Sequence, residues 1–188
     1  MRKSRFVDIV RAVAGLIAAT LGIAASAATA FDEMSGQLER ISSCDVSMFP
    51  VNKRGEVILA GFVKDLAGAG VRSRHTGTPP EDQTTYMLPR AIKVFGQPVT
   101  KIDDLNPPFV KIEFDMSADE LLAAINRTTG ETFIKNPGLY ELITKKRFLV
   151  AGKKYPFERN IYIQGSGAKK STYICRYDDT DPNAQGDA

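Results

Sequence analysis

Two cysteines near opposite ends of the chain place the tightest constraint on its fold. Cys44 and Cys175 are the only cysteines among 188 residues, so only one intramolecular pairing is possible. Such a disulfide would close a loop of about 130 residues, for which chain-entropy models give on the order of 4–5 kcal/mol. The chain has no Cys-x-x-Cys motif, which favours a structural bridge over a redox-active pair. The bridge requires an oxidising compartment.

The first thirty residues indicate such a compartment. Three basic residues within the first five precede an apolar run over residues 13–25, and small residues follow. This pattern is typical of a secretory signal peptide, here cleaved after Ala27 or Ala30. The apolar run is shorter than the ~20 residues of a membrane-spanning helix. We therefore expect a periplasmic or secreted protein with no membrane span after signal cleavage.

Signal cleavage also changes the charge of the chain. The whole sequence has a formal net charge of +3. Residues 1–30 hold four basic residues and one acidic residue, so their removal leaves 21 of each sign. A neutral mature chain has no general attraction to nucleic acid or to an anionic membrane.

The clearest local structure is predicted over residues 109–130. Apolar and charged residues alternate over 109–115, as in a strand with one buried face. Ser117 and Glu120 then form the capping box of a helix, which Gly130 ends. We therefore expect a strand followed directly by a helix.

Apolar spacing predicts further elements of both kinds. A helix is expected over 31–43, and residues 65–85, rich in glycine and proline, are expected to form a long mobile loop. Strands are expected over 56–64, 90–95, 99–102, 160–164 and 171–177, the last two forming a hairpin. Residues 139–150 fit a strand with a basic outer face or a short helix, and the strand is favoured.

These elements predict an α+β fold. We expect a single domain over residues 31–177, with an antiparallel sheet, two helices packed on one face and one disulfide. The acidic segment 178–188 has no large apolar residues and is expected to be disordered.

The residue inventory argues against several kinds of catalytic site. His75 is the only histidine, and no nucleophile-elbow motif accompanies it. One histidine and two paired cysteines are too few for a zinc site, so we expect no metal and no cofactor. Glu113 and Asp115 share one face of the predicted strand and suggest an acid–base pair. Acid–base catalysis needs one carboxyl group with a raised pKa. The alternative is that these two acids are ordinary charges on the solvated face of a strand.

Basic residues suggest two contact surfaces instead. The first is the expected loop, with Arg72, Arg74 and His75. The second is a C-terminal sheet face that combines basic and aromatic side chains: Lys145, Lys146, Arg147, Lys169, Lys170 and Tyr173. The alternative is that these are scattered lysines that protect edge strands from aggregation.

The leading interpretation is an exported, non-enzymatic protein-binding module. An inhibitor, an immunity-type protector or an envelope accessory factor would fit, with another envelope or secreted protein as partner. The alternative is a carboxylate- or Ser/Lys-dependent hydrolase that acts on an envelope polymer. A third interpretation is a structural envelope protein without a discrete ligand.

Overall fold

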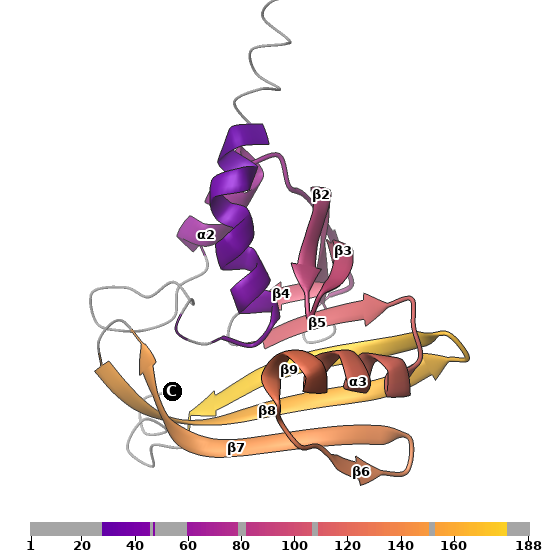
Figure 1. Cartoon of the computed structure of the whole chain (residues 1–188). Coiled ribbons are helices and arrows are strands. Elements are labelled where there is room, and N and C mark those ends of the chain that lie inside the picture. Colours follow the sequence, from indigo (N-terminus) through magenta and orange to yellow (C-terminus); the bar gives the residue numbers. More distant parts are fainter. Residues whose placement is uncertain are drawn as a thin grey trace, which may run out of the picture.

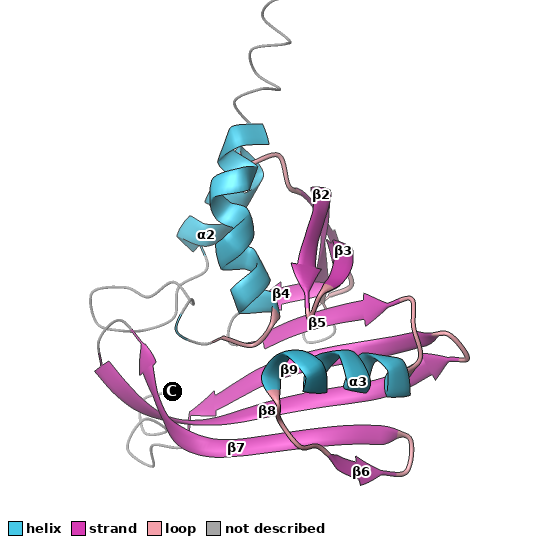
Figure 2. Ribbon diagram, viewed as in Figure 1, coloured by secondary structure: helices cyan, strands magenta, loops and turns pink. Residues whose placement is uncertain are grey.

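The computed structural model describes residues 28–45, 47, 60–78, 82–106, 109–150 and 153–179. A helix over residues 28–42 comes first within them (Figures 1 and 2). The elements that follow are α2 (Ala60–Gly68), β1 (Arg72–Thr76), β2 (Gln83–Val94), β3 (Gln97–Ile102), β4 (Asp104–Asn106), β5 (Phe109–Phe114), α3 (Ala118–Thr129), β6 (Ile134–Asn136), β7 (Leu139–Val150), β8 (Lys153–Gly167) and β9 (Lys170–Asp179).

The strands form two antiparallel sheets. The small sheet has the order β1-β2-β3, and the large sheet has the order β4-β5-β9-β8-β7-β6. One residue, Asp103, separates β3 in the small sheet from β4 in the large one. The predicted α+β class is therefore confirmed, with two sheets where one was expected and, in the described chain, three helices where two were expected.

The turn between β2 and β3 brings the two sheets together in the core. Phe95 and Gly96 both have positive φ angles, 53° and 76°, as a two-residue type I′ hairpin requires. The Phe95 ring is buried and meets Tyr173 of β9 edge-on, with 5.2 Å between centroids. Strands were predicted on both sides of this turn, and β2 and β3 confirm them.

Helix α3 follows β5 as predicted. The Ser117 hydroxyl accepts a hydrogen bond from the Glu120 backbone N–H at 3.3 Å, and the Glu120 carboxylate accepts one from the Ser117 N–H at 2.8 Å. Gly130 ends the helix in the left-handed conformation, with φ 69°. The helix lies over β8 and β9 (Figure 1). Its buried side chains are Leu121, Ala124 and Ile125.

The helix over 28–42 stands beside the small sheet (Figure 1). The Lys93 backbone N–H donates to Glu39 Oε1 at 2.7 Å. Arg90 forms an ion pair with Asp32, and its guanidinium lies 5.5 Å from the centre of the Phe31 ring. The helix predicted over 31–43 is thus present, and it also includes residues 28–30, which were assigned to the signal peptide. Residues 1–27 lie outside the described chain.

The predicted disulfide between Cys44 and Cys175 is present. It joins the chain just after the first helix to β9, with 5.7 Å between the two Cα atoms. Both cysteines are buried, and the Tyr177 hydroxyl donates to the Cys44 carbonyl at 2.5 Å. The bridge therefore lies inside the core, where it fixes the helix to the centre of the large sheet.

Two predictions between residues 56 and 85 were wrong. Residues 60–64 belong to α2 instead of a strand, because Phe62 and Leu66, one helical turn apart, are buried together. Residues 56–59 lie outside the described chain. The expected loop over 65–85 contains the end of α2, all of β1 and the start of β2. Every residue of β1 is exposed and none is apolar, so alternation of apolar and polar residues could not predict this strand.

The C-terminal hairpin was predicted correctly but is longer than expected. β7 covers exactly the predicted residues 139–150, and β8 pairs with β9. Asp178 and Asp179 pair with Glu158 and Phe157, so they belong to the sheet and not to a disordered tail. Residues 180–188 lie outside the described chain.

None of the helices described has the length and apolar character needed to cross a membrane.

Candidate functional site

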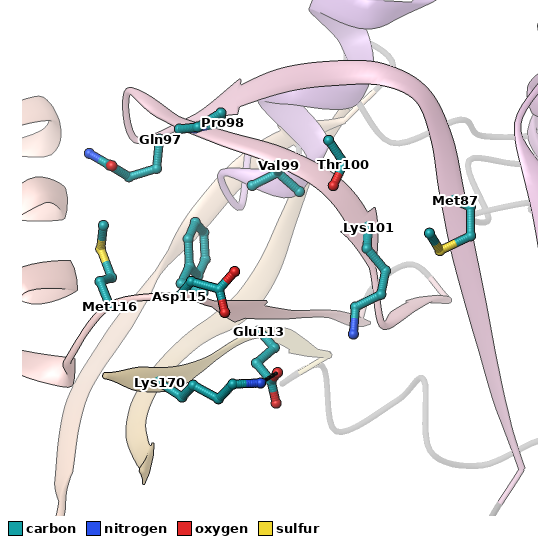
Figure 3. A pocket seen from close by; sticks show the side chains of 11 residues that line it. Met87, Gln97, Pro98, Val99, Thr100, Lys101, Glu113, Asp115, Met116 and Lys170 are labelled. Carbon is teal, nitrogen blue, oxygen red and sulfur yellow. Dashed lines mark hydrogen bonds and ion pairs between the residues drawn. The ribbon is translucent and has the colours of Figure 1, made fainter. Parts of the chain in front are cut away.

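A pocket of about 500 Å³ opens where the small sheet meets the large one (Figure 3). Residues 97–101 of β3 and Met87 of β2 line one wall. Residues 113–116, from the end of β5 into the turn before α3, line the other wall together with Lys170 of β9. The walls come from segments far apart in the sequence, so no local pattern could reveal the pocket.

A second pocket of about 500 Å³ continues from the first toward α3. It shares Gln97, Asp115 and Met116 with the first pocket. Its remaining lining comes from α3 and from the turn before β9: Glu120, Ala123, Arg127 and Lys169. We call the two connected pockets the junction groove.

Asp103 holds the two walls of the junction groove in place. This residue is 8% exposed and lies between β3 and β4. Its Oδ1 is 2.7 Å from the Lys101 Nζ, and its Oδ2 accepts the Glu113 backbone N–H at 2.7 Å. Its carbonyl accepts a hydrogen bond from the Gln83 side chain at 2.7 Å. One buried carboxylate thus ties β3 to β5.

Glu113 and Lys170 form an ion pair in the groove. The Lys170 Nζ lies 2.9 Å from Glu113 Oε1. The hydrogen bond from Lys170 lowers the pKa of Glu113 below its usual value, and the same contact raises the pKa of Lys170. Glu113 is therefore ionised at neutral pH, so its carboxyl group is unsuited to act as a general acid.

The groove also presents apolar side chains to solvent. Met87 is 40% exposed, Pro98 is exposed and Met116 is partly exposed. Methionine side chains are flexible and polarizable and fit partners of different shape. The groove therefore combines adaptable apolar contacts with fixed charges.

Arg72, Arg74 and His75 lie outside this groove, on the exposed edge strand β1. His75 Nδ1 is 3.0 Å from the Thr84 hydroxyl, and His75 Nε2 is 3.8 Å from the Asp82 carboxylate. The strand presents its basic residues to solvent, which is also how natural sheets protect their edges from further pairing.

The expected C-terminal contact face does not form as one surface. Tyr173 is fully buried. Lys145 lies opposite Glu158, with 3.1 Å between the charged atoms, and Glu158 lies opposite Asp178. Eight positions of β9 separate Asp178 from Lys170, which is about 26 Å at ~3.3 Å per residue.

The basic residues of the C-terminal half thus divide between two ends of the sheet. Lys169 and Lys170 both line the junction groove, whereas Lys145 does not. The backbones of Lys146 and Arg147 continue β7 beyond Lys145, and their side chains lie outside the described part of the structure.

Sequence reasoning found only part of the groove. It selected Glu113, Asp115 and the two lysines of the β8–β9 turn, whereas it missed Asp103, Lys101 and the methionines.

Within the described ranges, no three His, Cys, Asp or Glu side chains are grouped so that they could hold a metal ion. Comparison of the chain with protein-family models, with curated proteins and with solved structures finds no match.

Proposed function

We propose that the chain is an exported, non-enzymatic protein-binding module that works in the periplasm or outside the cell. An inhibitor, an immunity-type protector or an envelope accessory factor fits this role. The observation that carries the proposal is the junction groove, an open recess with exposed apolar side chains and charges already held in ion pairs. Protein interfaces typically combine an apolar centre with a polar rim.

The charges of the groove favour binding over hydrolysis. A carboxylate-dependent hydrolase acting on an envelope polymer needs one carboxyl group that stays protonated at working pH. The lowered pKa of Glu113 and its ion pair with Lys170 work against this role. The same ion pair is well suited to a fixed, polar contact surface.

Two features support export. The disulfide between Cys44 and Cys175 is of the kind that persists in oxidising compartments. The N-terminal segment has basic residues followed by an apolar run, which is the pattern of a secretory signal peptide. Because Ala30 packs against the core within a helix that includes residue 28, cleavage after Ala27 is favoured over cleavage after Ala30.

The experiment is affinity capture of envelope proteins by the mature protein, followed by mass spectrometry. Three baits are compared: the wild type, Met87→Lys and Ile134→Lys. Met87 and Ile134 are both exposed apolar residues, 40% and 62% respectively, but only Met87 lines the groove. We expect a partner that the wild type and the Ile134 variant retain and that the Met87 variant loses.

Two results would contradict the proposal. One is that no protein is retained by the wild type above the level of an unrelated bait. The other is that the protein cleaves an envelope polymer and that Glu113→Gln or Asp115→Asn abolishes the cleavage, because this would establish the hydrolase.

A further inference from the structure

Strand β1 has a free edge within the described chain. It is the outermost strand of the small sheet and pairs with β2 alone, along its whole length. In an antiparallel ladder, alternate residues direct their N–H and C=O groups away from the partner strand. Among the described residues, no hydrogen bond joins the backbone of residues 72–76 to a group beyond β2. The edge therefore keeps backbone hydrogen-bonding capacity for a further strand.

The strand register places the two arginines of β1 on the solvent face of the small sheet. Arg72 lies opposite Met87, and Arg74 lies opposite Thr85. Successive residues of a strand alternate between the two faces, so these four side chains share one face. Tyr86, which lies between two of them on β2, is only 5% exposed, so the other face is the one turned toward the core.

The solvent face near this edge carries positive charge that no acid on the same face balances. Its strand positions hold only basic, uncharged polar and methionine residues: Arg72, Arg74, Thr76, Gln83, Thr85, Met87 and Lys101. Lys101 is paired with Asp103. Asp82 lies 3.8 Å from His75, which belongs to the opposite face. The two arginines have no ion-pair partner in the described part of the chain, so their charge remains available.

This charge selects the kind of strand that can add to the edge. If β1 of a second copy paired with it in the fully overlapping two-fold register, Arg74 would lie opposite its own counterpart. Like charges directly opposite each other destabilise a strand pair, so the arginines oppose self-association. A carboxylate has the reverse effect, because a guanidinium group binds it through two parallel hydrogen bonds. The edge therefore discriminates in favour of an acidic segment.

The β1 edge also borders the junction groove. Met87 lies opposite Arg72 in the sheet and lines the groove as well. A partner with apolar side chains in the groove therefore has the arginines of β1 beside it.

We propose that β1 binds an acidic, extended segment of the partner protein as a fourth strand of the small sheet. Two Asp or Glu residues of this segment, two positions apart, lie beside Arg72 and Arg74, whose Cα atoms are about 6.6 Å apart along the strand. This inference rests on the proposed binding function and specifies the chemistry of the partner.

The first test measures binding of fluorescein-labelled eight-residue peptides by fluorescence anisotropy at low salt. One peptide alternates Glu and Thr, which places all its acids on one face of a strand. The matched control has the same composition in the repeated order Glu-Glu-Thr-Thr, which divides the acids between the two faces. We expect the alternating peptide to bind the disulfide-bonded mature protein about threefold or more tightly than the control. Equal affinities, or no binding of either peptide, would overturn the proposal.

Charge reversal tests the two arginines. The double variant Arg72→Glu with Arg74→Glu should weaken binding of the alternating peptide at least about tenfold. The matched control is Lys93→Glu with Lys135→Glu, which changes charge equally at exposed positions away from β1 and should leave binding within about twofold. Equal effects of the two double variants would contradict the assignment.

Amide hydrogen exchange, followed by NMR, tests strand addition itself. At saturating peptide, the β1 amides that face away from β2 should exchange at least about tenfold more slowly, whereas those bonded to β2 should change little. If binding leaves the outward amides unprotected, the carboxylates contact only the arginine side chains and the added strand is wrong.

The added strand and the binding function fail in different ways. If envelope capture depends on Met87 but the variant Arg72→Glu with Arg74→Glu still retains the partner, β1 is wrongly assigned and the proposed function stands. If the alternating peptide binds and protects β1 but the wild type retains no envelope protein, β1 is correctly assigned and the proposed function is wrong.

Discussion

Asp103 shows how much of this structure depends on a single side chain. Its carboxylate contacts Lys101 on one sheet and the Glu113 N–H on the other. In the sequence it is one of two adjacent aspartates, and nothing in its neighbours distinguishes it from Asp104. Its role appears only when β3 and β5 are brought together by contacts that are distant in the chain.

We expect Asp103→Ala to lower the free energy of unfolding by about 2–3 kcal/mol. The change leaves the Glu113 N–H without its charged acceptor, and hydrogen bonds to charged groups contribute about 1.5–3 kcal/mol each. Urea denaturation followed by circular dichroism measures the loss. The control is Asp115→Ala, an exposed acid of the same groove, which should change stability by less than about 0.5 kcal/mol. Similar values for the two variants would show that Asp103 does not tie the sheets together.

At the scale of elements, predictability follows how locally each element is specified. The limits of β5 and α3 were predicted because alternation and a capping box lie within a few residues. The run over 56–64 was wrong in its described part, because a short apolar run fits a buried helix as well as a strand. β1 was missed because it is an edge strand held by pairing with β2, not by burial of its side chains.

The cap of α3 carries the prediction at this scale. Ser117→Ala removes the acceptor for the Glu120 N–H and should lower the free energy of unfolding by about 1 kcal/mol at neutral pH. The Ser117 hydrogen bonds lower the pKa of Glu120, so its contribution is present above its ordinary pKa and is lost as pH falls through the lower folded-state value.

The cost of Ser117→Ala should therefore shrink in acid, which denaturation curves at neutral pH and near pH 3 would measure. Thr132→Ala, at an exposed position after the helix, serves as the control. A cost that is unchanged in acid would show that the hydrogen bond from the Ser117 hydroxyl to the Glu120 carboxylate does not contribute to the cap.

The whole molecule is held together by contacts between its first and last described segments. The disulfide, the Tyr177 hydrogen bond to Cys44 and the Phe95–Tyr173 ring contact all join β9 to earlier parts of the chain. Only the disulfide among these was predictable, since two cysteines allow one pairing. The groove has the same nonlocal origin, which is why sequence reasoning singled out Lys169, Lys170, Glu113 and Asp115 without placing them in one groove.

We expect the native protein to contain no free thiol. Labelling in denaturant without reductant should modify neither cysteine, and labelling after reduction should modify both. The double variant Cys44→Ala with Cys175→Ala should lose about 2–5 kcal/mol of stability, the usual cost of removing such a bridge. Two labelled thiols before reduction would refute the assignment.

The disulfide also sets an order of events during synthesis. Cys175 lies 131 residues after Cys44. At ~5–20 residues per second, a ribosome makes Cys175 roughly 7–26 s after Cys44. Throughout that interval the Cys44 thiol has no partner in its own chain. The first helix can therefore be joined covalently to the large sheet only after β9 has been made, and until then the Cys44 thiol is open to exchange with foreign thiols.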